Sequence, residues 1–252
     1  MRRQKKMTKI LKLSYGHCPC CEKRTLFKSH DYNYREYYQC IRCGSNPRQR
    51  AIIKVIKYLY PNWTETKIHE SSPSGATFKK MLHTCNEYSY SYFYPEKNLG
   101  EPLNESNQVT NQNLENLTFP DESFDLFITQ DVLEHINEPL KALKEIYRCL
   151  KPGGLHIFTV PVALFKSTRP RIKIENGKIT PIMEEVYHGN PISEKGSLVT
   201  YDWGGDICSI IDNTAPFKTK VISFYPSKEN HQIGVDAMPI FIFVSTKAPN
   251  ID

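Results

Sequence analysis

The amino-acid sequence predicts an α/β fold with a Rossmann-like, mostly parallel sheet, preceded by a small zinc ribbon. Residues 124–160 read as strand, helix and strand joined by tight turns, which is the βαβ unit of a parallel sheet. Upstream, two C-x2-C pairs have the spacing of a tetrathiolate zinc site. We therefore expect four segments: a basic tail over residues 1–14, a zinc-ribbon-like segment over 15–45, a linking helix over 46–62 and a main domain over 63–252.

The composition of the 252-residue chain narrows the class of protein. Hydrophobic residues make up 39% and charged residues 24%, which excludes a collagen-like, low-complexity or wholly disordered chain. No run approaches the ~20 apolar residues that cross a bilayer, and no apolar signal core follows the basic N-terminus. We expect a cytoplasmic protein without a membrane partner. Part of the net charge of +6 lies in the tail, which is either a solvated segment or a contact for RNA or another polyanion.

The two cysteine pairs predict a closed structural zinc site. Each C-x2-C turn directs two thiolates at one point, and two such turns complete a tetrahedron around Zn2+. Because no export signal is present, disulfides are the weaker interpretation. Cys20 lies inside the first pair and is an alternative to Cys21 as a ligand. The predicted ligands are Cys18, Cys21, Cys40 and Cys43. Between the pairs, the aromatic residues of 27–39 predict a short hairpin, whose rings either fill the ribbon's small core or stack on bases.

The remaining elements follow from apolar periodicity and from turn residues. Asn46 as N-cap and Pro47 in the first turn open an amphipathic helix that ends before Pro61. Residues 95–112 are polar, which predicts a long surface loop. His156 falls within a strand, where we expect a core or edge residue. Strands are expected over 67–69, 88–94, 124–129, 155–160, 220–225 and 240–245, and helices over 76–82 and 140–150.

The segment 113–161 resembles the class I S-adenosylmethionine-dependent methyltransferases, in particular their type 11-like domains. The resemblance rests on L-x-F-P-D at residues 117–121, F-D at 124–125, E-H at 134–135 and R-x-L-K-P-G-G at 148–154, in this order and at close spacing. A zinc ribbon ahead of such a domain resembles a bacterial group of methyltransferases with a cysteine-rich N-terminal segment. The resemblance implies S-adenosylmethionine as cofactor, in addition to structural Zn2+.

The resemblance also implies where the cofactor binds. In an open parallel sheet, ligands lie beyond the carboxyl ends of the strands, where the strand order reverses. In the family, the first loop cradles the methionine part, the second holds the ribose and the third edges the adenine. The first loop usually reads acid-x-G-x-G, whereas residues 70–75 read E-S-S-P-S-G. The usual acid of the second loop is missing near Ser91, and Asn113 stands where Asp is common. The implied cofactor-binding residues are Glu70, Ser71, Ser72, Gly75, Ser91, Asn113, Leu114 and Gln130.

Three residues are candidates for catalysis. Methyl transfer is an in-line displacement that depends on positioning, and it needs a general base when the acceptor is a hydroxyl. His135 follows the fourth strand, where the family's E-H pair faces the cofactor cleft; the alternative is a helix-start residue bonded to backbone. Asp131 stands beside it, and either Asp131 or Glu134 is an alternative cap for the next turn. His188 lies in a polar, aromatic insertion after the fifth strand, which is either substrate-facing or an ordinary surface loop.

The expected function is methyl transfer from S-adenosylmethionine to a hydroxyl of a small molecule or glycan. Two alternatives differ in class: an RNA methyltransferase that grips RNA with ribbon and tail, and a non-catalytic binding module with a degenerate cofactor site. A basic face from Lys5 through Arg50 would favour RNA. A closed pocket near His188 and Trp203 would favour a small acceptor.

Overall fold

The structure is a computed structural model that describes residues 9–105, 108–190 and 193–249. These residues form two compact units, each built from separated stretches of sequence. The first unit contains the chain up to Pro61, Gly75–His83 and Ile222–Ile242. The second contains Asn62–Ser74, Thr84–Val221 and the residues from Phe243 onward. Over the described parts of the chain, none of the helices has the length and apolar content to cross a membrane.

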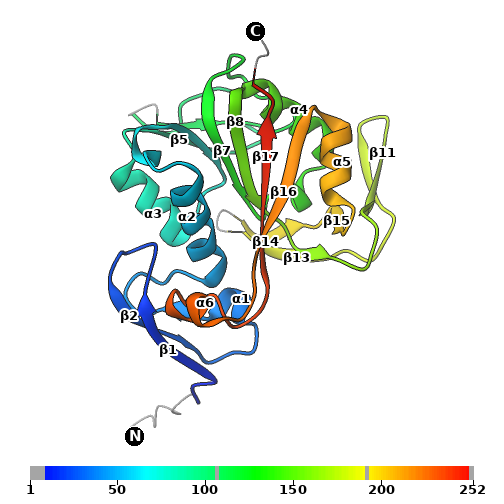
Figure 1. The fold of residues 1–252 in the computed structure, drawn as a ribbon. Helices are drawn as coiled ribbons and strands as arrows, with labels where there is room; N and C mark the ends of the chain where they lie inside the picture. Colours follow the sequence, from blue (N-terminus) through cyan, green and yellow to red (C-terminus); the bar gives the residue numbers. More distant parts are fainter. Residues whose placement is uncertain (1–8, 106–107, 191–192, 250–252) are drawn as a thin grey trace, which may run out of the picture. The chain divides into compact units, whose positions relative to one another are not determined.

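A seven-stranded sheet in the order β16-β17-β8-β7-β4-β5-β6 confirms the predicted α/β fold (Figure 1). The pairs β6–β5, β5–β4, β4–β7 and β7–β8 are parallel, and β17 runs antiparallel to β8. The strand order reverses between β4 and β7, which makes this edge the topological switch point. The strands are β4 (Lys67–Ser71), β5 (Glu87–Tyr92), β6 (Val109–Asn111), β7 (Phe124–Gln130), β8 (Leu150–Thr159), β16 (Phe217–Phe224) and β17 (Ile240–Lys247).

The central strands are buried on both faces, which explains their nearly continuous apolar sequence. Two histidines are part of this core. His69 bonds through its ring nitrogens to the hydroxyls of Ser89 and Ser91, at 2.9 and 3.0 Å. His156 bonds through Nε2 to the Thr129 hydroxyl at 3.0 Å. Burial lowers the pKa of both histidines to about 3, so they are neutral core residues, as expected for His156.

The linking helix begins at its predicted signals. Asn46 caps α2 (Pro47–Leu59), and the Gln49 side chain bonds back to the Asn46 amide in a capping box. Pro139 opens α4 (Pro139–Cys149), which lies beside α5 (Ile207–Thr214) in the second unit (Figure 1). The other helices are α1 (Tyr34–Tyr37), α3 (Gly75–Thr84) and α6 (Lys228–Gln232).

The loop prediction for residues 95–112 is wrong in its last part. Residues 109–111 form β6, and both Asn111 and Gln112 are buried. The Asn111 amide donates to the carbonyls of Tyr94, Lys97 and Asn98, at 3.1, 2.9 and 3.2 Å. This polar stretch is therefore ordered by an amide side chain that satisfies the backbone of the preceding turn.

The ribbon also differs from its predicted form. Its hairpin joins β1 (Lys12–His17) to β2 (Arg24–Ser29), and β3 (Gln39–Cys40) adds a third antiparallel strand. The expected hairpin over 27–39 is present only at its ends, where Phe27 and Lys28 of β2 pair with Cys40 and Gln39 of β3. The residues between contain α1 and the buried Tyr38, whose ring meets that of Phe27 edge-on at 6.2 Å. Tyr38 therefore fills the small core rather than lying in a strand, whereas Tyr32 and Tyr37 are exposed. Residues 12–14, expected in the tail, are the start of β1.

An insertion follows β8 and carries three small sheets. Their orders are β10-β15-β9, β11-β12 and β13-β14. The strands are β9 (Val162–Ala163), β10 (Arg169–Pro170), β11 (Ile172–Glu175), β12 (Lys178–Pro181), β13 (Tyr187–Asn190), β14 (Ser193–Leu198) and β15 (Tyr201–Gly204). Thr200 donates from its backbone N–H and its hydroxyl to the Glu134 carbonyl, at 2.8 and 3.1 Å, which ties the insertion to the end of β7.

Candidate functional site

The switch point brings predicted cofactor residues from β4, β5 and β7 to one edge of the sheet. The strand register pairs Ser71 with Ser91 on one side and with Thr129 on the other. Gln130 is the last residue of β7, directly after Thr129. Because these strands are parallel, their carboxyl ends share this edge, as the family resemblance implies for the cofactor.

Glu70 is fully buried at this edge and has two donors. The Tyr88 hydroxyl donates to its Oε2 at 2.7 Å, and the Gln130 amide donates to its Oε1 at 2.6 Å. Burial and the neighbouring carboxylate raise the pKa of Tyr88, so it stays a donor. Among the described residues, no donor reaches the buried Oε1 of Gln130. This edge therefore offers negative charge and an open acceptor to a ligand that carries N–H groups.

The first loop replaces glycine with serine at a backbone position that favours glycine. Ser72 has φ +52°, in the left-handed region, where a side chain costs about 1–2 kcal/mol. Its N–H donates to the Ser91 carbonyl at 2.8 Å, which holds this conformation. Gly75 has φ +68° and lies in the first unit as the first residue of α3. The other predicted cofactor-binding residues lie in the second unit.

The third loop is shaped by its own turn. Asn113 Oδ1 accepts from the Glu115 N–H at 2.9 Å, an Asx turn that leaves the side-chain NH2 for another acceptor. Leu114 follows as a buried apolar residue. An amide donor and an apolar surface are the groups that an adenine edge and face require.

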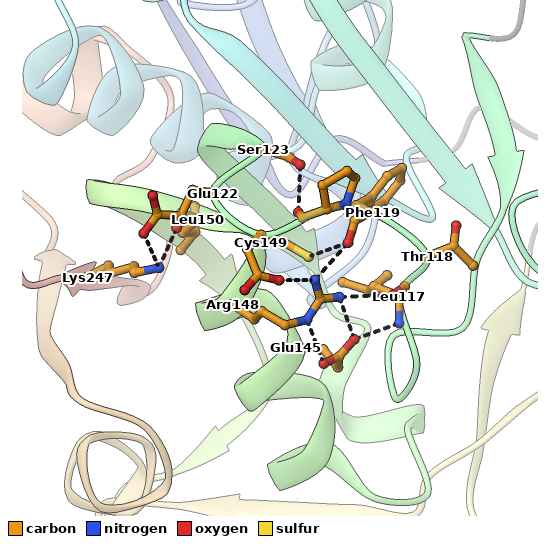
Figure 2. A network of polar contacts seen from close by, with 12 residues as sticks. Leu117, Thr118, Phe119, Glu122, Ser123, Glu145, Arg148, Cys149, Leu150 and Lys247 are labelled. Carbon is orange, nitrogen blue, oxygen red and sulfur yellow. Dashed lines mark hydrogen bonds and ion pairs between the residues drawn. The ribbon is translucent and has the colours of Figure 1, made fainter.

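Arg148 holds the residues after this loop in place (Figure 2). Its guanidinium donates to the carbonyls of Leu117 and Phe119, at 3.0 and 2.7 Å, and forms ion pairs with Glu145 and Asp121, at 2.8 and 2.7 Å. Arg148 also lowers the pKa of Glu145, whose Oε2 accepts from the Leu117 N–H at 3.0 Å. The motifs L-x-F-P-D and R-x-L-K-P-G-G therefore occur together because one anchors the other, which is a structural role.

His135 lies in a 3-10 turn (Leu133–His135) directly after β7, and its ring orientation is fixed. Nδ1 lies 2.8 Å from the Leu198 carbonyl. Because a carbonyl oxygen only accepts, Nδ1 carries the hydrogen and Nε2 holds a lone pair. Burial lowers the pKa of His135, and the nearby His188 adds to this effect, so the neutral ring is favoured.

Glu134 joins the two predicted histidines into one cluster. The His135 and His188 ring centroids are 5.0 Å apart. His135 Nε2 and His188 Nδ1 lie 3.8 and 3.9 Å from Glu134 Oε1. Sequence reasoning considered Glu134 only as a cap, although its place in the E-H pair was a signal for a functional role. We call Glu134, His135 and His188 the Glu–His–His cluster.

Asp131 forms hydrogen bonds with Thr159 next to this cluster. Its Oδ1 accepts from the Thr159 hydroxyl at 2.9 Å, and its N–H donates to the Thr159 carbonyl at 2.9 Å. Asp131 has φ +53°, a conformation that aspartate tolerates better than most residues. These contacts tie the carboxyl end of β7 to that of β8.

A cavity of about 390 Å3 opens beside the cluster, and both Glu134 and His188 line it. Trp203, at the cavity wall, is 1% exposed. Three cationic residues also line the cavity: Lys166, Arg169 and Arg171. Asp202 pairs with Arg169 at 3.2 Å and with Arg171 at 3.0 Å. The cavity is lined by charged and aromatic side chains, which suits a small acceptor with charged or hydroxyl groups.

The four predicted zinc ligands come together in the first unit. The Sγ atoms of Cys18, Cys21, Cys40 and Cys43 all lie within 4.8 Å of one another. Cys18 is 3.7 Å from Cys43, and Cys21 is 3.9 Å from Cys40. Sulfurs at ~2.3 Å from a tetrahedral ion stand about 3.8 Å apart. The group contains Cys21 and not Cys20, so the geometry favours Cys21 as the ligand.

Buried Arg50 donates hydrogen bonds to the backbone around the cysteine group. Its guanidinium donates to the carbonyls of Tyr38 and Gly234, at 2.8 and 2.5 Å, and also to that of Ser45. The Ser45 hydroxyl lies 3.3 and 3.2 Å from the sulfurs of Cys18 and Cys43. Arg50 and Ser45 together connect the cysteine group to the backbone around it.

Comparison with known proteins identifies the central segment. Residues 74–158 match the family model described as "Methyltransferase domain". The chain is 31% identical over 90 residues to a dimethylglycine N-methyltransferase of Parasynechococcus marenigrum, covering 36% of this chain and 30% of that protein. It is 52% identical over 42 residues to a ubiquinone/menaquinone biosynthesis C-methyltransferase of Hydrogenovibrio crunogenus, covering 17% and 16%. The match thus spans less than a third of these curated relatives.

Solved structures resemble the chain over a larger share of its length, at low identity. An S-adenosylmethionine-dependent methyltransferase from Mesorhizobium loti aligns with 78% of this chain and 97% of its own, at 18% identity and a TM-score of 0.48. A 1,6-didemethyltoxoflavin-N1-methyltransferase from Burkholderia thailandensis aligns with 80% and 78%, at 10% identity and a TM-score of 0.48. Residues 74–158 thus match a methyltransferase domain, and the motifs at residues 117–154 lie within this segment.

Proposed function

We propose that the protein is an S-adenosylmethionine-dependent methyltransferase whose acceptor is a hydroxyl of a small molecule or glycan. The observation that carries this proposal is the Glu–His–His cluster at the wall of the 390 Å3 cavity. Glu134 and His135 follow β7, whose end Asp131 ties to the end of β8. In an open α/β sheet, this edge is where a bound ligand reacts.

The residues at the switch point fit the cofactor. Its methionine part carries an ammonium group, and the open Gln130 Oε1 beside the Glu70 carboxylate offers acceptance and negative charge. Ser71 and Ser91 pair next to this point, and Asn113 and Leu114 supply the donor and the apolar surface for an adenine. When bound, S-adenosylmethionine supplies a methyl carbon to the acceptor oxygen, and the carbon–sulfur bond breaks with its electron pair on sulfur.

The cluster suits an oxygen acceptor better than an amine. A neutral amine attacks with its own lone pair, whereas a hydroxyl must lose its proton as the new bond forms. A buried carboxylate and two imidazoles are groups that assist this loss. The curated relatives named above act on nitrogen and on carbon, so the hydroxyl assignment comes from the cluster alone.

The charge at the cavity supports an acidic acceptor. Three cations, Lys166, Arg169 and Arg171, face two carboxylates, Glu134 and Asp202. A carboxylate, sulfate or phosphate on the acceptor would balance this excess. A sugar acid or a phosphorylated sugar has both the anion and the hydroxyl.

In the first unit, we propose that the four gathered cysteines bind one structural Zn2+. The sulfur spacing supports a tetrahedral ion, and all four are free thiols. Thiolate ligation requires reduced cysteines, so we place the protein in the cytoplasm.

Titration of zinc-loaded protein with S-adenosylhomocysteine by calorimetry tests the proposal. We expect micromolar binding, and we expect Glu70→Gln to weaken it by about tenfold, because the amide removes the charge behind Gln130. Glu138→Gln, an exposed carboxylate of the same unit, is the matched control and should bind like the wild type. Absence of binding up to millimolar ligand would contradict the cofactor assignment and favour a non-catalytic binding module.

A further inference from the structure

We propose that the Glu–His–His cluster binds one divalent transition-metal ion, which in turn coordinates the acceptor oxygen. This inference rests on the proposed methyl transfer and names how the hydroxyl is activated. The ligand atoms of the three residues lie within 4.8 Å of one another. One carboxylate and two imidazoles form a facial set that leaves other positions of the ion open to an oxygen ligand.

The hydrogen bond of His135 is the kind that supports a metal ligand. A ligating histidine usually donates its other ring N–H to a carbonyl or carboxylate, which fixes the ring and directs the free nitrogen at the ion. Nδ1–H of His135 donates to the Leu198 carbonyl at 2.8 Å. Its Nε2 lone pair is thereby left on the side of Glu134 Oε1, 3.8 Å away.

The backbone holds all three residues in place. The Glu134 carbonyl accepts from Thr200, and His135 bonds to the carbonyl of Leu198, two residues away along the chain. Leu198 pairs with Tyr187 across β13 and β14, which places the neighbouring His188 beside Glu134 and His135. Ligands of an ion at ~2.1 Å stand about 3.0–3.4 Å apart, so Glu134 Oε1 needs to approach the two nitrogens by less than 1 Å from 3.8 and 3.9 Å.

The charge of the cluster favours a cation. Glu134 is 1% exposed, and its Oε1 lies 3.8 and 3.9 Å from ring nitrogens of His135 and His188. A divalent ion at this point would balance the charge of the buried carboxylate and part of the acceptor's charge as well. Nitrogen and oxygen ligands without a thiolate suit Mn2+, Fe2+ or Zn2+.

The ion would promote reaction in two ways. It lowers the pKa of a coordinated hydroxyl, so that the proton is released to solvent and the oxygen becomes a nucleophile at neutral pH. It also fixes the position of that oxygen within the cavity, which favours an in-line approach to the methyl carbon. As in the proposed function, the methyl group is transferred to the acceptor oxygen and S-adenosylhomocysteine is the thioether that leaves.

Paramagnetic resonance with Mn2+ alone as the probe tests this inference on the full chain loaded with one equivalent of zinc, which the four cysteines take up. Mn2+ prefers oxygen and nitrogen ligands over thiolates, so the cysteine group does not compete for it. We expect the free Mn2+ signal to fall as one ion binds per chain, with micromolar affinity. Glu134→Gln and His188→Ala should each weaken binding at least about tenfold. Glu138→Gln and His83→Ala are matched controls outside the cluster and should bind like the wild type.

Two results would overturn the inference: an undiminished free Mn2+ signal with wild-type protein, or equal binding by wild type and both cluster variants. Thermal melting of each variant without Mn2+ shows that a loss of binding is local; His188 is half-buried and its replacement leaves the core untouched. Calorimetry with S-adenosylhomocysteine on the same samples separates the two proposals. Mn2+ binding without cofactor binding supports the metal site and contradicts the methyl transfer, whereas cofactor binding without Mn2+ binding contradicts the metal site alone.

Discussion

The residues that the structure describes contain two groups of potential metal ligands, and these groups are built in opposite ways. The four cysteines come from two short turns, and the geometry leaves no position for a further ligand. The Glu–His–His cluster joins adjacent residues to a strand more than fifty positions later, and it borders a cavity. A closed group of ligands stabilises a fold, whereas an incomplete group beside a cavity is able to bind a reactant. Loss of the first should therefore unfold a unit, and loss of the second should stop a reaction.

The largest expected effect is that of Cys40→Ser on stability. Because a small ribbon has little core, bound zinc contributes on the order of 10 kcal/mol to its folding, and removal of one thiolate should abolish zinc binding and unfold the ribbon. Zinc stoichiometry and thermal melting measure both consequences. Cys20→Ser is the matched control and should keep one zinc, since Cys20 lies outside the four gathered sulfurs. Retained zinc and an unchanged melt in Cys40→Ser would show that the two groups do not differ as described.

Glu134→Gln should reduce turnover and leave stability unchanged. We expect turnover to fall by about 10²-fold or more, the usual contribution of a group that activates a nucleophile, while the melting temperature and zinc content stay close to wild type. The measurement is a steady-state methyl-transfer assay once an acceptor is identified, with Glu138→Gln alongside. Wild-type turnover in Glu134→Gln would remove the cluster from the reaction.

Arg148→Ala tests a polar network that involves neither group. Loss of its charged hydrogen bonds to two carbonyls should lower the free energy of unfolding by about 2 kcal/mol. The adenine-edge loop loses its anchor, so S-adenosylhomocysteine binding should weaken too, whereas zinc and Mn2+ binding should be unaffected. Chemical denaturation and calorimetry measure the two effects, and Lys144→Ala on the same helix is the control. An unchanged unfolding curve would mean that the network in Figure 2 contributes little.

The smallest expected effect is a gain in the stability of the first loop. Ser72→Gly relieves a left-handed serine at φ +52° and should stabilise the first loop by up to about 1 kcal/mol, partly offset by the greater chain entropy of glycine. This stabilisation should appear as S-adenosylhomocysteine binding that is tighter by a few-fold. Ser74→Gly in the same loop has no positive φ to relieve and should not tighten binding. Weaker binding in Ser72→Gly would mean that the serine side chain itself contacts the cofactor.

The difference between the two ligand groups also explains which features of the fold and the site local sequence patterns can predict. The gathering of the four cysteines and the strand–helix–strand unit depend on spacing within short stretches, and the structure contains both. His135 and His188 were each candidates, but their meeting at Glu134 depends on the register of β13 with β14, which no local pattern encodes. The strand at residues 109–111 was missed because its polar sequence is ordered by the buried amide of Asn111. The aromatic stretch of the ribbon was predicted as strand because its closely spaced tyrosines resemble the alternation of a strand, although Tyr34–Tyr37 form α1 and only Tyr38 enters the core.

The first unit has a consequence for how the protein is made. The ribbon is synthesised well before Ile222–Ile242, which belong to the same unit. Lys12 forms an ion pair with Asp236 at 3.0 Å, and the backbone of Gln232 covers Gly16 so closely that a side chain there would clash. During synthesis at 5–20 residues per second, the nascent ribbon therefore waits roughly ten seconds or more for its last partner. Capture of zinc by the two cysteine pairs would give this waiting segment an early, self-contained fold.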